Sequence, residues 1–355
     1  MPAEKRELEV VPNGEAKEGS STGVEVLDRE SFFSRSKAAR LRRNPEKPPI
    51  AAMYSSLVDG IVTDPELMTL PLDDHAIVRG HAIFDTATLA NGRVYRLGLH
   101  LDRLFASAKD ARLKLPFGPT EEENRARITD IVCRTCVASG CRDGSIRYYL
   151  SAGPGNFGIT SEGCEPAFYC VVYGILREFA KFEAVDEVLV RSVPMKPPLL
   201  ARVKSNNYML NSLTAMAAKD RGGRFGILVH GDDTIAEGCI VNAAFVTADR
   251  TLVTPPFDNI LAGTTVRKAM ELARKHLIKE GGLLREVRQE AVPVATAFAA
   301  VEVMLLGGDT HLVPIKSLDG KQVGDGKPGP VATELHRLLV QEAEQGEGDH
   351  IELKY

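Results

Sequence analysis

The stretch IFDTATLANGRVYRL, residues 83–97, points most directly to a type of fold. Two runs rich in apolar and β-branched residues flank Asn91-Gly92, and this dipeptide is a strong hairpin signal because both residues tolerate positive φ. We therefore expect two antiparallel strands, at Ile83–Ala90 and Val94–Leu97. Such a hairpin favours a sheet in which neighbours in the chain pair directly, in place of strict β-α-β alternation.

Regular patterns continue on both sides of this hairpin. Apolar residues at helical spacing predict helices over residues 100–115, 121–139, 208–219, 265–280 and 331–345. Short apolar runs predict further strands at residues 53–57, 60–62, 145–151, 167–173, 225–229, 241–247, 251–253 and 301–306. Because the strands come in hairpin pairs more often than they alternate with helices, we expect an α+β fold with mixed sheets and flanking helices.

The composition changes near residue 50. At ~150 residues per domain, the 355 residues suffice for two compact domains. The first 48 residues mix Glu, Lys, Ser and Gly and carry a basic stretch at residues 35–43. They predict a flexible N-terminal tail over residues 1–50 with one exposed helix, the alternative being a targeting or partner-binding arm. The regular part predicts a small α+β domain over residues 51–174 and a larger cofactor-binding domain over residues 180–345.

Composition and charge argue against several classes of protein. Hydrophobic residues make up 44% of the chain and charged residues 26%, which is unlike a disordered or fibrous protein. The net charge of −4 argues against nucleic-acid binding driven by bulk charge. No apolar run approaches the ~18 residues of a membrane span, and no glycine-rich dinucleotide or P-loop motif follows a predicted strand. We expect small-molecule substrates, and no nucleic acid, membrane or metal ion as a partner.

The six cysteines are too sparse for a disulfide scaffold, and no signal-peptide pattern precedes them. Cys133 and Cys136 form a CxxC pair inside a predicted helix. We interpret them as packed helix residues, with a redox pair as the alternative. The glutamates near the N-terminus contradict the acid-poor composition of a transit peptide. These features predict a cytoplasmic protein, or a plastid protein if a longer precursor exists.

Two segments carry residue types that act in covalent and electrostatic catalysis. Lys204 follows an apolar, proline-rich approach, and in such surroundings a lysine can lose its proton and become a nucleophile. A surface lysine fits the same pattern. Glu237 stands between a turn and a predicted strand and precedes a glycine. It could hold a cationic ring nitrogen or serve as an ordinary turn residue.

Other segments carry groups that bind anions or wall a pocket. Gly263, Thr264 and Thr265 precede a predicted helix, where free N–H groups and the helix dipole favour a phosphate; a plain helix cap is the alternative. Arg103 falls in the first turn of the predicted helix 100–115, off its apolar face. It can fork onto a phosphate or remain a solvated arginine. Phe84 could wall a pocket or pack in the core.

Together these groups match the needs of pyridoxal phosphate: a lysine for its aldehyde, an acid for its ring nitrogen, and an arginine with a helix start for its phosphate. In their order and context, residues 79–85, 100–104, 204–208, 236–242 and 254–265 resemble the class IV pyridoxal-phosphate aminotransferases. The resemblance spans about residues 52–345. Residues 52–56, 140–145, 150–155 and 194–198 are most similar to the plant-type D-amino-acid transaminase subgroup.

The resemblance implies the two-domain D-amino-acid-transaminase-like fold, which is fold type IV of the pyridoxal-phosphate enzymes. It implies that Lys204 forms the internal aldimine and moves the Cα proton, that Glu237 pairs with the ring nitrogen, and that Tyr208 bonds the ring hydroxyl. It further implies a cofactor-binding set completed by Arg103, Asn242, Leu261, Gly263, Thr264 and Thr265.

On the substrate side the sequence departs from bacterial D-amino-acid transaminases. Phe84 replaces a tyrosine, and Ala152 stands where those enzymes place a carboxylate-binding arginine. Arg147, in the preceding strand, is a substitute cation. The substrate-binding residues that the resemblance implies, with this substitute, are Phe84, Arg147, Gly308, Asp309 and Thr310.

The resemblance implies a homodimer and a ping-pong transfer of the amino group from a D-amino acid, such as D-alanine, to 2-oxoglutarate. Three other functions stay open at this point. They are 4-amino-4-deoxychorismate lyase activity, branched-chain L-amino-acid aminotransferase activity, and a non-catalytic binding role.

Overall fold

The computed structural model describes residues 23–42, 50–174, 182–308, 311–345 and 350–355. The chain forms two units, residues 1–44 and residues 45–355. The first unit contains helix α1 (Arg29–Leu41), which Asp28 caps and in which no residue is buried. An exposed helix is therefore present as expected, although it begins before the basic stretch. The rest of the predicted flexible tail, residues 1–22 and 43–49, lies outside the described residues.

The second unit begins with a sheet whose strand order is β17-β4-β3-β5-β6-β1-β2. Its neighbouring strands all pair antiparallel. The strands are β1 (Ile50–Ser55), β2 (Gly60–Val62), β3 (Ala82–Ala90), β4 (Arg93–Tyr95), β5 (Gly144–Ser151), β6 (Ala167–Tyr173) and β17 (His350–Glu352). The predicted hairpin joins β3 to β4, and Asn91 and Gly92 adopt φ values of 51° and 73°.

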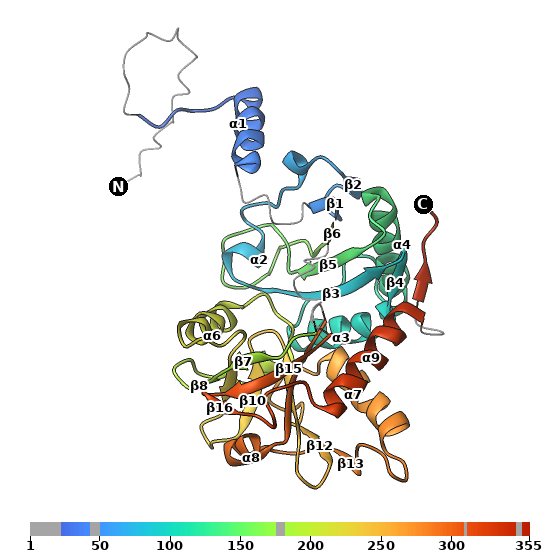
Figure 1. Ribbon diagram of the computed structural model, residues 1–355. Coiled ribbons are helices and arrows are strands. Elements are labelled where there is room, and N and C mark those ends of the chain that lie inside the picture. The colour runs from blue at the N-terminus through green and yellow to red at the C-terminus, as the bar shows by residue number, and fades with distance from the viewer. Residues whose placement is uncertain (1–22, 43–49, 175–181, 309–310, 346–349) are drawn as a thin grey trace. The chain divides into compact units, whose positions relative to one another are not determined.

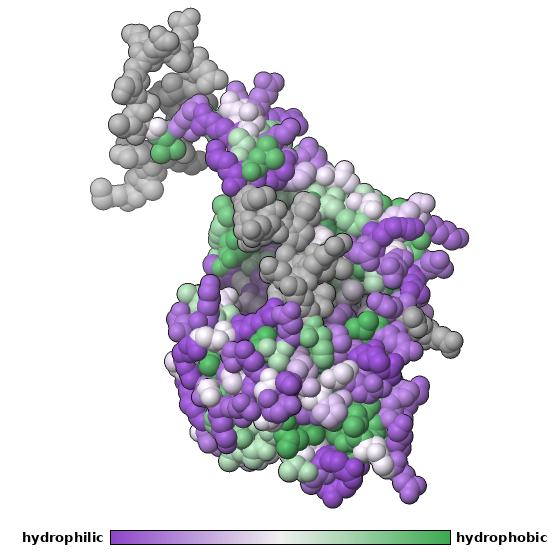
Figure 2. Space-filling view, viewed as in Figure 1, coloured by the Kyte–Doolittle hydropathy of each residue, from purple (hydrophilic) through white to green (hydrophobic). Residues whose placement is uncertain are grey.

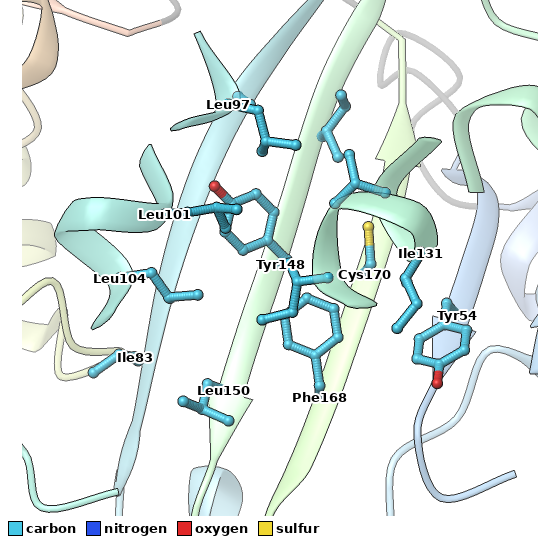
Figure 3. Packing of buried hydrophobic residues seen from close by; sticks show 14 of the residues in the cluster. Tyr54, Ile83, Leu97, Leu101, Leu104, Ile131, Tyr148, Leu150, Phe168 and Cys170 are labelled. Carbon is cyan, nitrogen blue, oxygen red and sulfur yellow. The ribbon is translucent and has the colours of Figure 1, made fainter. Parts of the chain in front are cut away.

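Helices α3 (Leu97–Asp110) and α4 (Glu121–Ser139) supply the apolar cover of this sheet. Leu101 and Leu104 of α3 and Ile131 of α4 pack toward Tyr148 of β5 and Phe168 of β6 (Figure 3). All five side chains are at most 2% exposed, so they form the continuous core that holds the helices on the sheet.

Two further sheets follow in the chain. A three-stranded sheet has the order β10-β9-β8, and a larger one has the order β13-β12-β11-β14-β15-β16, with β7 paired to β15. The strands are β7 (Val185–Glu187), β8 (Leu189–Val190), β9 (Ile227–Val229), β10 (Ile235–Gly238), β11 (Asn242–Val246), β12 (Thr251–Thr254), β13 (Glu286–Gln289), β14 (Glu302–Gly307), β15 (His311–Leu318) and β16 (Lys321–Gln322). Parallel pairs β12–β13 and β7–β15 occur beside antiparallel ones, so the sheet is mixed as expected.

The larger sheet is buried on both faces. Alternate residues of β11 and β14 enter different cores: Phe245 and Leu305 pack on one side, Ala244 and Leu306 on the other. This explains why the two strands read as continuous apolar runs in the sequence. Helices α7 (Thr264–Leu272) and α9 (Pro330–Gln345) lie side by side over the second core (Figure 1).

Several predicted bounds are wrong for local reasons. Helix α3 spans Leu97–Asp110 and does not extend to residue 115, since Arg112 adopts a left-handed φ of 54°. Helix α7 ends at Leu272 and continues as a π-helical turn, Ala273–Leu277, not to residue 280. The sequence patterns also missed β10, β13, β15, β17 and the short helices α2 (His75–Val78), α5 (Pro198–Arg202) and α8 (Val294–Ala299).

Other bounds are confirmed. Helix α4 spans the predicted residues because a capping box of Thr120 and Glu123 starts it and left-handed Gly140 ends it. Helix α6 (Met209–Asp220) is shifted by one residue. Among the described residues no helix is both long enough and apolar enough to cross a membrane. The division at residues 174–180 into a small and a large domain stays a prediction.

Candidate active site

A cavity of about 220 Å³ opens between elements of the first and the larger second sheet. It is lined by Phe84, Thr86, His100, Arg103, Arg147, Lys204, Tyr208, Ile240, Val241, Asn242, Leu261, Thr264, Thr265, Leu306, Gly307 and Gly308. A smaller hollow of about 20 Å³ shares Lys204 and Tyr208 with it and is also lined by Lys196, Asn211 and Glu237. Most of the predicted site residues therefore surround one continuous space.

Three predicted residues are not among those lining residues. Gly263 lies beside the cavity, where an added Cβ atom would fall 2.0 Å from Asn242 Oδ1, so a larger residue would have to displace the Asn242 side chain. Asp309 and Thr310 lie outside the described residues. The neighbouring Gly308 does line the cavity.

The backbone around Lys204 is hydrogen-bonded to the first sheet and to α3. The N–H of Phe84 donates to the carbonyl of Lys204 at 2.9 Å, and the N–H of Asn206 donates to the carbonyl of Ala82 at 3.0 Å. The N–H of Lys204 donates to Ser107 Oγ at 3.2 Å. The segment that carries Lys204 thus pairs with β3 through backbone hydrogen bonds, and these bonds fix the position of the Lys204 Cα atom.

The amine of Lys204 has aromatic neighbours and forms no ion pair with any residue that the structure describes. Its Nζ lies 3.3 Å from Tyr208 Oη and 4.7 Å from the ring centroid of Phe84. Burial, with the nearby charge of Arg103, lowers the pKa of Lys204 to about 8. A lysine of this kind is partly unprotonated near neutral pH, which is the state that attacks carbonyl groups.

Glu237 lies within strand β10 and is 6% exposed, so its predicted position at a turn before a strand is wrong. Its Oε2 accepts the N–H of Leu261 at 3.1 Å. Burial raises the pKa of Glu237 to about 7, against the opposing charges of Lys196 and Lys204. The carboxylate therefore keeps acceptor capacity for a donor in the hollow.

Arg103 takes part in a buried cluster with Asp85 and His100. Its Nε and Nη2 donate to Asp85 Oδ2 and Oδ1 at 2.8 and 2.7 Å, and His100 Nδ1 lies 2.9 Å from Asp85 Oδ1. Asp85 is completely buried. Burial alone would raise the pKa of Asp85, but the charges of Arg103 and His100 hold it well below its usual range.

This cluster corrects the expected placement of Arg103. The side chain is 13% exposed and sits in the second turn of α3, because the helix begins at Leu97. Its two-point contact with Asp85 orients the guanidinium, and Nη1 lies 3.4 Å from the carbonyl of Ala262, just before the start of α7. Arg103 and the helix start therefore face the same end of the cavity.

The start of α7 is built for close approach. Gly263 is the N-cap and makes no side-chain cap bond, so Thr264 and Thr265 begin the helix with hydroxyls that line the cavity. The first N–H groups of a helix have no intrahelical partner and carry partial positive charge. Asn242 Nδ2 donates to the carbonyl of Leu261 at 3.0 Å, which holds the preceding turn against β11. This end of the cavity can bind an anion.

Arg147 of β5 contributes a second cation to the wall of the cavity. Its Nε donates to Thr86 Oγ1 at 3.1 Å, and its guanidinium carbon lies 5.3 Å from the ring centroid of Phe84. Both neighbours belong to β3, which pairs directly with β5. Strand pairing therefore sets the position of this arginine.

Sequence reasoning missed four residues that shape the site: Asp85, His100, Lys196 and Asn211. Asp85, His100 and Lys196 lie in the segments 79–85, 100–104 and 194–198 that carry the resemblance, and the i, i+3 spacing of His100 and Arg103 places these two on one helix face. That spacing was the available signal. No local pattern indicates that Lys196 and Asn211 line a hollow with Glu237.

Comparisons with known proteins give a consistent result. The family model of the amino-transferases of class IV matches residues 82–318. "D-amino-acid transaminase, chloroplastic" from Arabidopsis thaliana is 44% identical over 83% of this chain and 77% of its own length. "D-alanine aminotransferase" from Listeria monocytogenes serotype 1/2a is 27% identical over 82% of this chain and 97% of its own length.

A solved branched-chain amino acid aminotransferase from Escherichia coli superposes on this chain with a TM-score of 0.73. It is 21% identical, and the match covers 86% of this chain and 100% of that one. At this level of identity the likeness shows a shared fold, and it confirms the expected α+β architecture.

Proposed function

Because the chain belongs to the class IV aminotransferases, we propose that it moves an amino group from a D-amino acid, such as D-alanine, to 2-oxoglutarate, with pyridoxal 5′-phosphate as its cofactor. The observation that carries the proposal is a grouping around the cavity and its adjoining hollow: an amine that forms no ion pair with the described residues, a buried carboxylate and a cationic anion site. The handedness of the donor and the identity of the acceptor rest on the resemblance to the D-amino-acid transaminases.

The residues around the cavity fit each polar part of this cofactor. Lys204 is a partly unprotonated amine that can bond to an aldehyde. Glu237 has spare acceptor capacity for a ring N–H, and Arg103, Thr264 and Thr265 offer donors to a phosphate. Buried charged groups with so few partners are costly in a protein that binds nothing there.

When bound, pyridoxal phosphate supplies a carbonyl that takes up the amino group and a ring that draws electrons away from the substrate. The chain's own residues then position and move protons. In each half of the transfer, the amine of Lys204 would take a proton from the carbon that loses the amino group and give one to the carbon that gains it. Tyr208 Oη, at 3.3 Å, holds that amine in place, and Glu237 keeps the ring nitrogen protonated by accepting its N–H.

We assign the substrate carboxylate to Arg147, supported by its contact with Thr86 and its place on the cavity wall. The backbone at Gly308 offers a further polar contact, and Phe84 limits the space beside the reacting carbon. Asp309 and Thr310 keep the substrate roles that the resemblance implies, as a proposal.

We also propose that the enzyme works as a homodimer. Large apolar side chains of α5 and α6 are exposed, and they are Leu199, Leu200, Met209, Leu213 and Met216. The last three are spaced along one face of α6. Figure 2 shows a face on which hydrophilic residues predominate between smaller hydrophobic patches. Sedimentation of the wild type at twice the chain mass, and of L213E/M216E at the chain mass, is expected; a monomeric wild type contradicts the homodimer.

The activity is tested with purified protein loaded with pyridoxal phosphate. D-alanine and 2-oxoglutarate together are expected to give pyruvate and D-glutamate over many turnovers. D-alanine alone gives at most one equivalent of pyruvate per site, and 2-oxoglutarate alone gives no product. Release of pyruvate from 4-amino-4-deoxychorismate without an acceptor favours the lyase, and amino transfer from L-leucine but not from D-alanine favours the branched-chain enzyme. A protein that stays colourless with the cofactor contradicts the proposal. The cytoplasmic location stays a prediction.

A further inference from the structure

We infer that Lys196 is a positioning residue: its ammonium group keeps the Glu237 carboxylate anionic and directed at the ring nitrogen of the cofactor. The inference rests on the proposed function. It concerns a lysine that precedes α5, outside the sheets, and that the sequence patterns did not single out.

The geometry places Lys196 at the hollow behind the reactive lysine. Lys196, Glu237 and Asn211 line the same space of about 20 Å³, which admits about one group of the size of a water molecule. The Nζ of Lys196 lies 5.4 Å from the ring centroid of Tyr208. It makes no ion pair within the part of the chain that the structure describes, so its charge is not committed elsewhere.

The other cations near the hollow have other partners or other tasks. Arg103 is bound at two points by Asp85, which neutralises it locally. Lys204 would bind the cofactor and carry protons, so its charge changes during the reaction. Cys239, beside Glu237, has a pKa that burial raises to about 12, so it is a neutral thiol. Among the residues that line the hollow, Lys196 is the cation whose charge would not change during the reaction.

Asn211 provides a second, independent observation. Its Nδ2 donates to the carbonyl of Cys239, whereas its Oδ1 is buried without a partner. Asn211 lines the hollow together with Glu237 and Lys196, so its oxygen is a second acceptor available to an ammonium group in this hollow.

The consequence concerns the charge of Glu237. Burial raises the pKa of Glu237, and Lys196 is the largest opposing influence. Without this lysine the carboxyl group is neutral over a wider pH range, and a neutral acid does not hold the ring nitrogen protonated. The loss is therefore largest below pH 7 and fades as Glu237 ionises at higher pH.

The test compares the wild type with K196M, K196R and the matched control K219M, which removes an exposed lysine at the end of α6. Three quantities are measured at about pH 6 and about pH 8. They are the dissociation constant of pyridoxal phosphate for the apo-protein, the absorption spectrum of the bound cofactor and the single-turnover rate with D-alanine. A rise of one unit in the Glu237 pKa lowers the ionised fraction about tenfold at the lower pH and about twofold at the higher.

We expect K196M to show losses of that order, K196R to recover most of the function, and K219M to match the wild type. Equal losses at both pH values, or none, overturn the role of Lys196. K196Q repeats the test if K196M does not fold. A wild type that binds no cofactor refutes the proposed function itself, so the two failures are distinguishable.

Discussion

Arg103 and Lys204 are both cations that face the same cavity, but their surroundings differ. Arg103 is held by a completely buried carboxylate, which also contacts His100. Lys204 has a tyrosine hydroxyl and an aromatic ring as neighbours, and the pKa of its ammonium group is lowered. Arg103, at the anion-binding end, therefore keeps its positive charge. Lys204, at the reactive end, can gain or lose a proton near neutral pH.

The difference shows how one fold supplies two kinds of cation. A buried ion pair gives a fixed orientation, and its integrity depends on both partners. An amine without an ion pair reduces the stability of the empty protein but gains reactivity. Predictions about the two ends therefore differ in sign.

The largest effect is expected at the reactive end. Lys204→Met removes the nucleophile and proton carrier, so transamination falls by at least about a thousandfold. Because folding no longer depresses a lysine pKa from 10.5 to about 8, the empty variant gains on the order of 3 kcal/mol of stability at neutral pH. Single-turnover kinetics and urea unfolding measure the two changes. A variant that is both active and less stable contradicts the comparison.

At the anion-binding end we expect loss of stability. Asp85→Asn leaves the buried Arg103 without its counter-charge, which costs about 3–5 kcal/mol in unfolding free energy and weakens cofactor binding. Asp102→Asn is the control, since Asp102 pairs with Arg125 on the exposed side of the same helix and such pairs contribute less than about 1 kcal/mol. If the two substitutions lower the unfolding free energy in urea equally, the buried Asp85–Arg103 pair contributes no more than an exposed pair, and this prediction is refuted.

A third substitution sharpens the comparison on the substrate side. Arg147→Met removes a cation that we assign to the substrate and not to the cofactor. The kcat/KM value for 2-oxoglutarate is expected to fall by about ten- to a hundredfold with unchanged cofactor affinity. Arg134→Met, at an exposed arginine of α4, serves as the control in the same steady-state assay. A parallel loss of cofactor binding argues against this assignment.

The remaining effect is a dependence of the empty protein's stability on pH. Glu237 has a pKa of about 7 in the folded chain against an ordinary 4.5, so the folded state binds more protons and stability falls as pH rises between these values. The slope from this group is at most about 1.4 kcal/mol per pH unit. Glu237→Gln removes it, which urea unfolding at several pH values detects.

Lys204 gives the opposite sign at higher pH. Its pKa is about 8 in the folded chain against 10.5 ordinarily, so the unfolded state binds more protons between these values and stability rises with pH there. The Lys204→Met variant lacks this rise. If the unfolding free energy of the wild type does not change between about pH 8 and about pH 10.5, the lowered pKa of Lys204 is contradicted.

The parts of the fold that could be predicted are those fixed by local chemistry. Asn91-Gly92 determines its own turn, and the Thr120 and Glu123 capping box determines where α4 begins. Strands β10 and β13 were missed because they are short and their pairing depends on distant residues. Arg112 ended α3 early through a left-handed backbone that the apolar pattern does not signal.

The candidate site shows the same division. Lys204, Glu237 and the start of α7 were found because their residue types and their family resemblance carry a chemical meaning. Asp85 and Lys196 were missed because their role follows from which charges the fold brings beside them. Lysine and aspartate are common on surfaces, so identity alone gives no reason to single them out.

The backbone hydrogen bonds between the Lys204 segment and β3 have a consequence for how substrates reach the cavity. The amides of Phe84 and Asn206 connect the loop of the reactive lysine to the first sheet, whereas Glu237 belongs to a different one. A hinge that moved the Lys204 segment away from the first sheet would break those two hydrogen bonds on every turnover. If both amides exchange their hydrogens slowly during turnover, this pairing stays intact. Substrates would then enter by movement of side chains and surface loops, without separation of the Lys204 segment from β3.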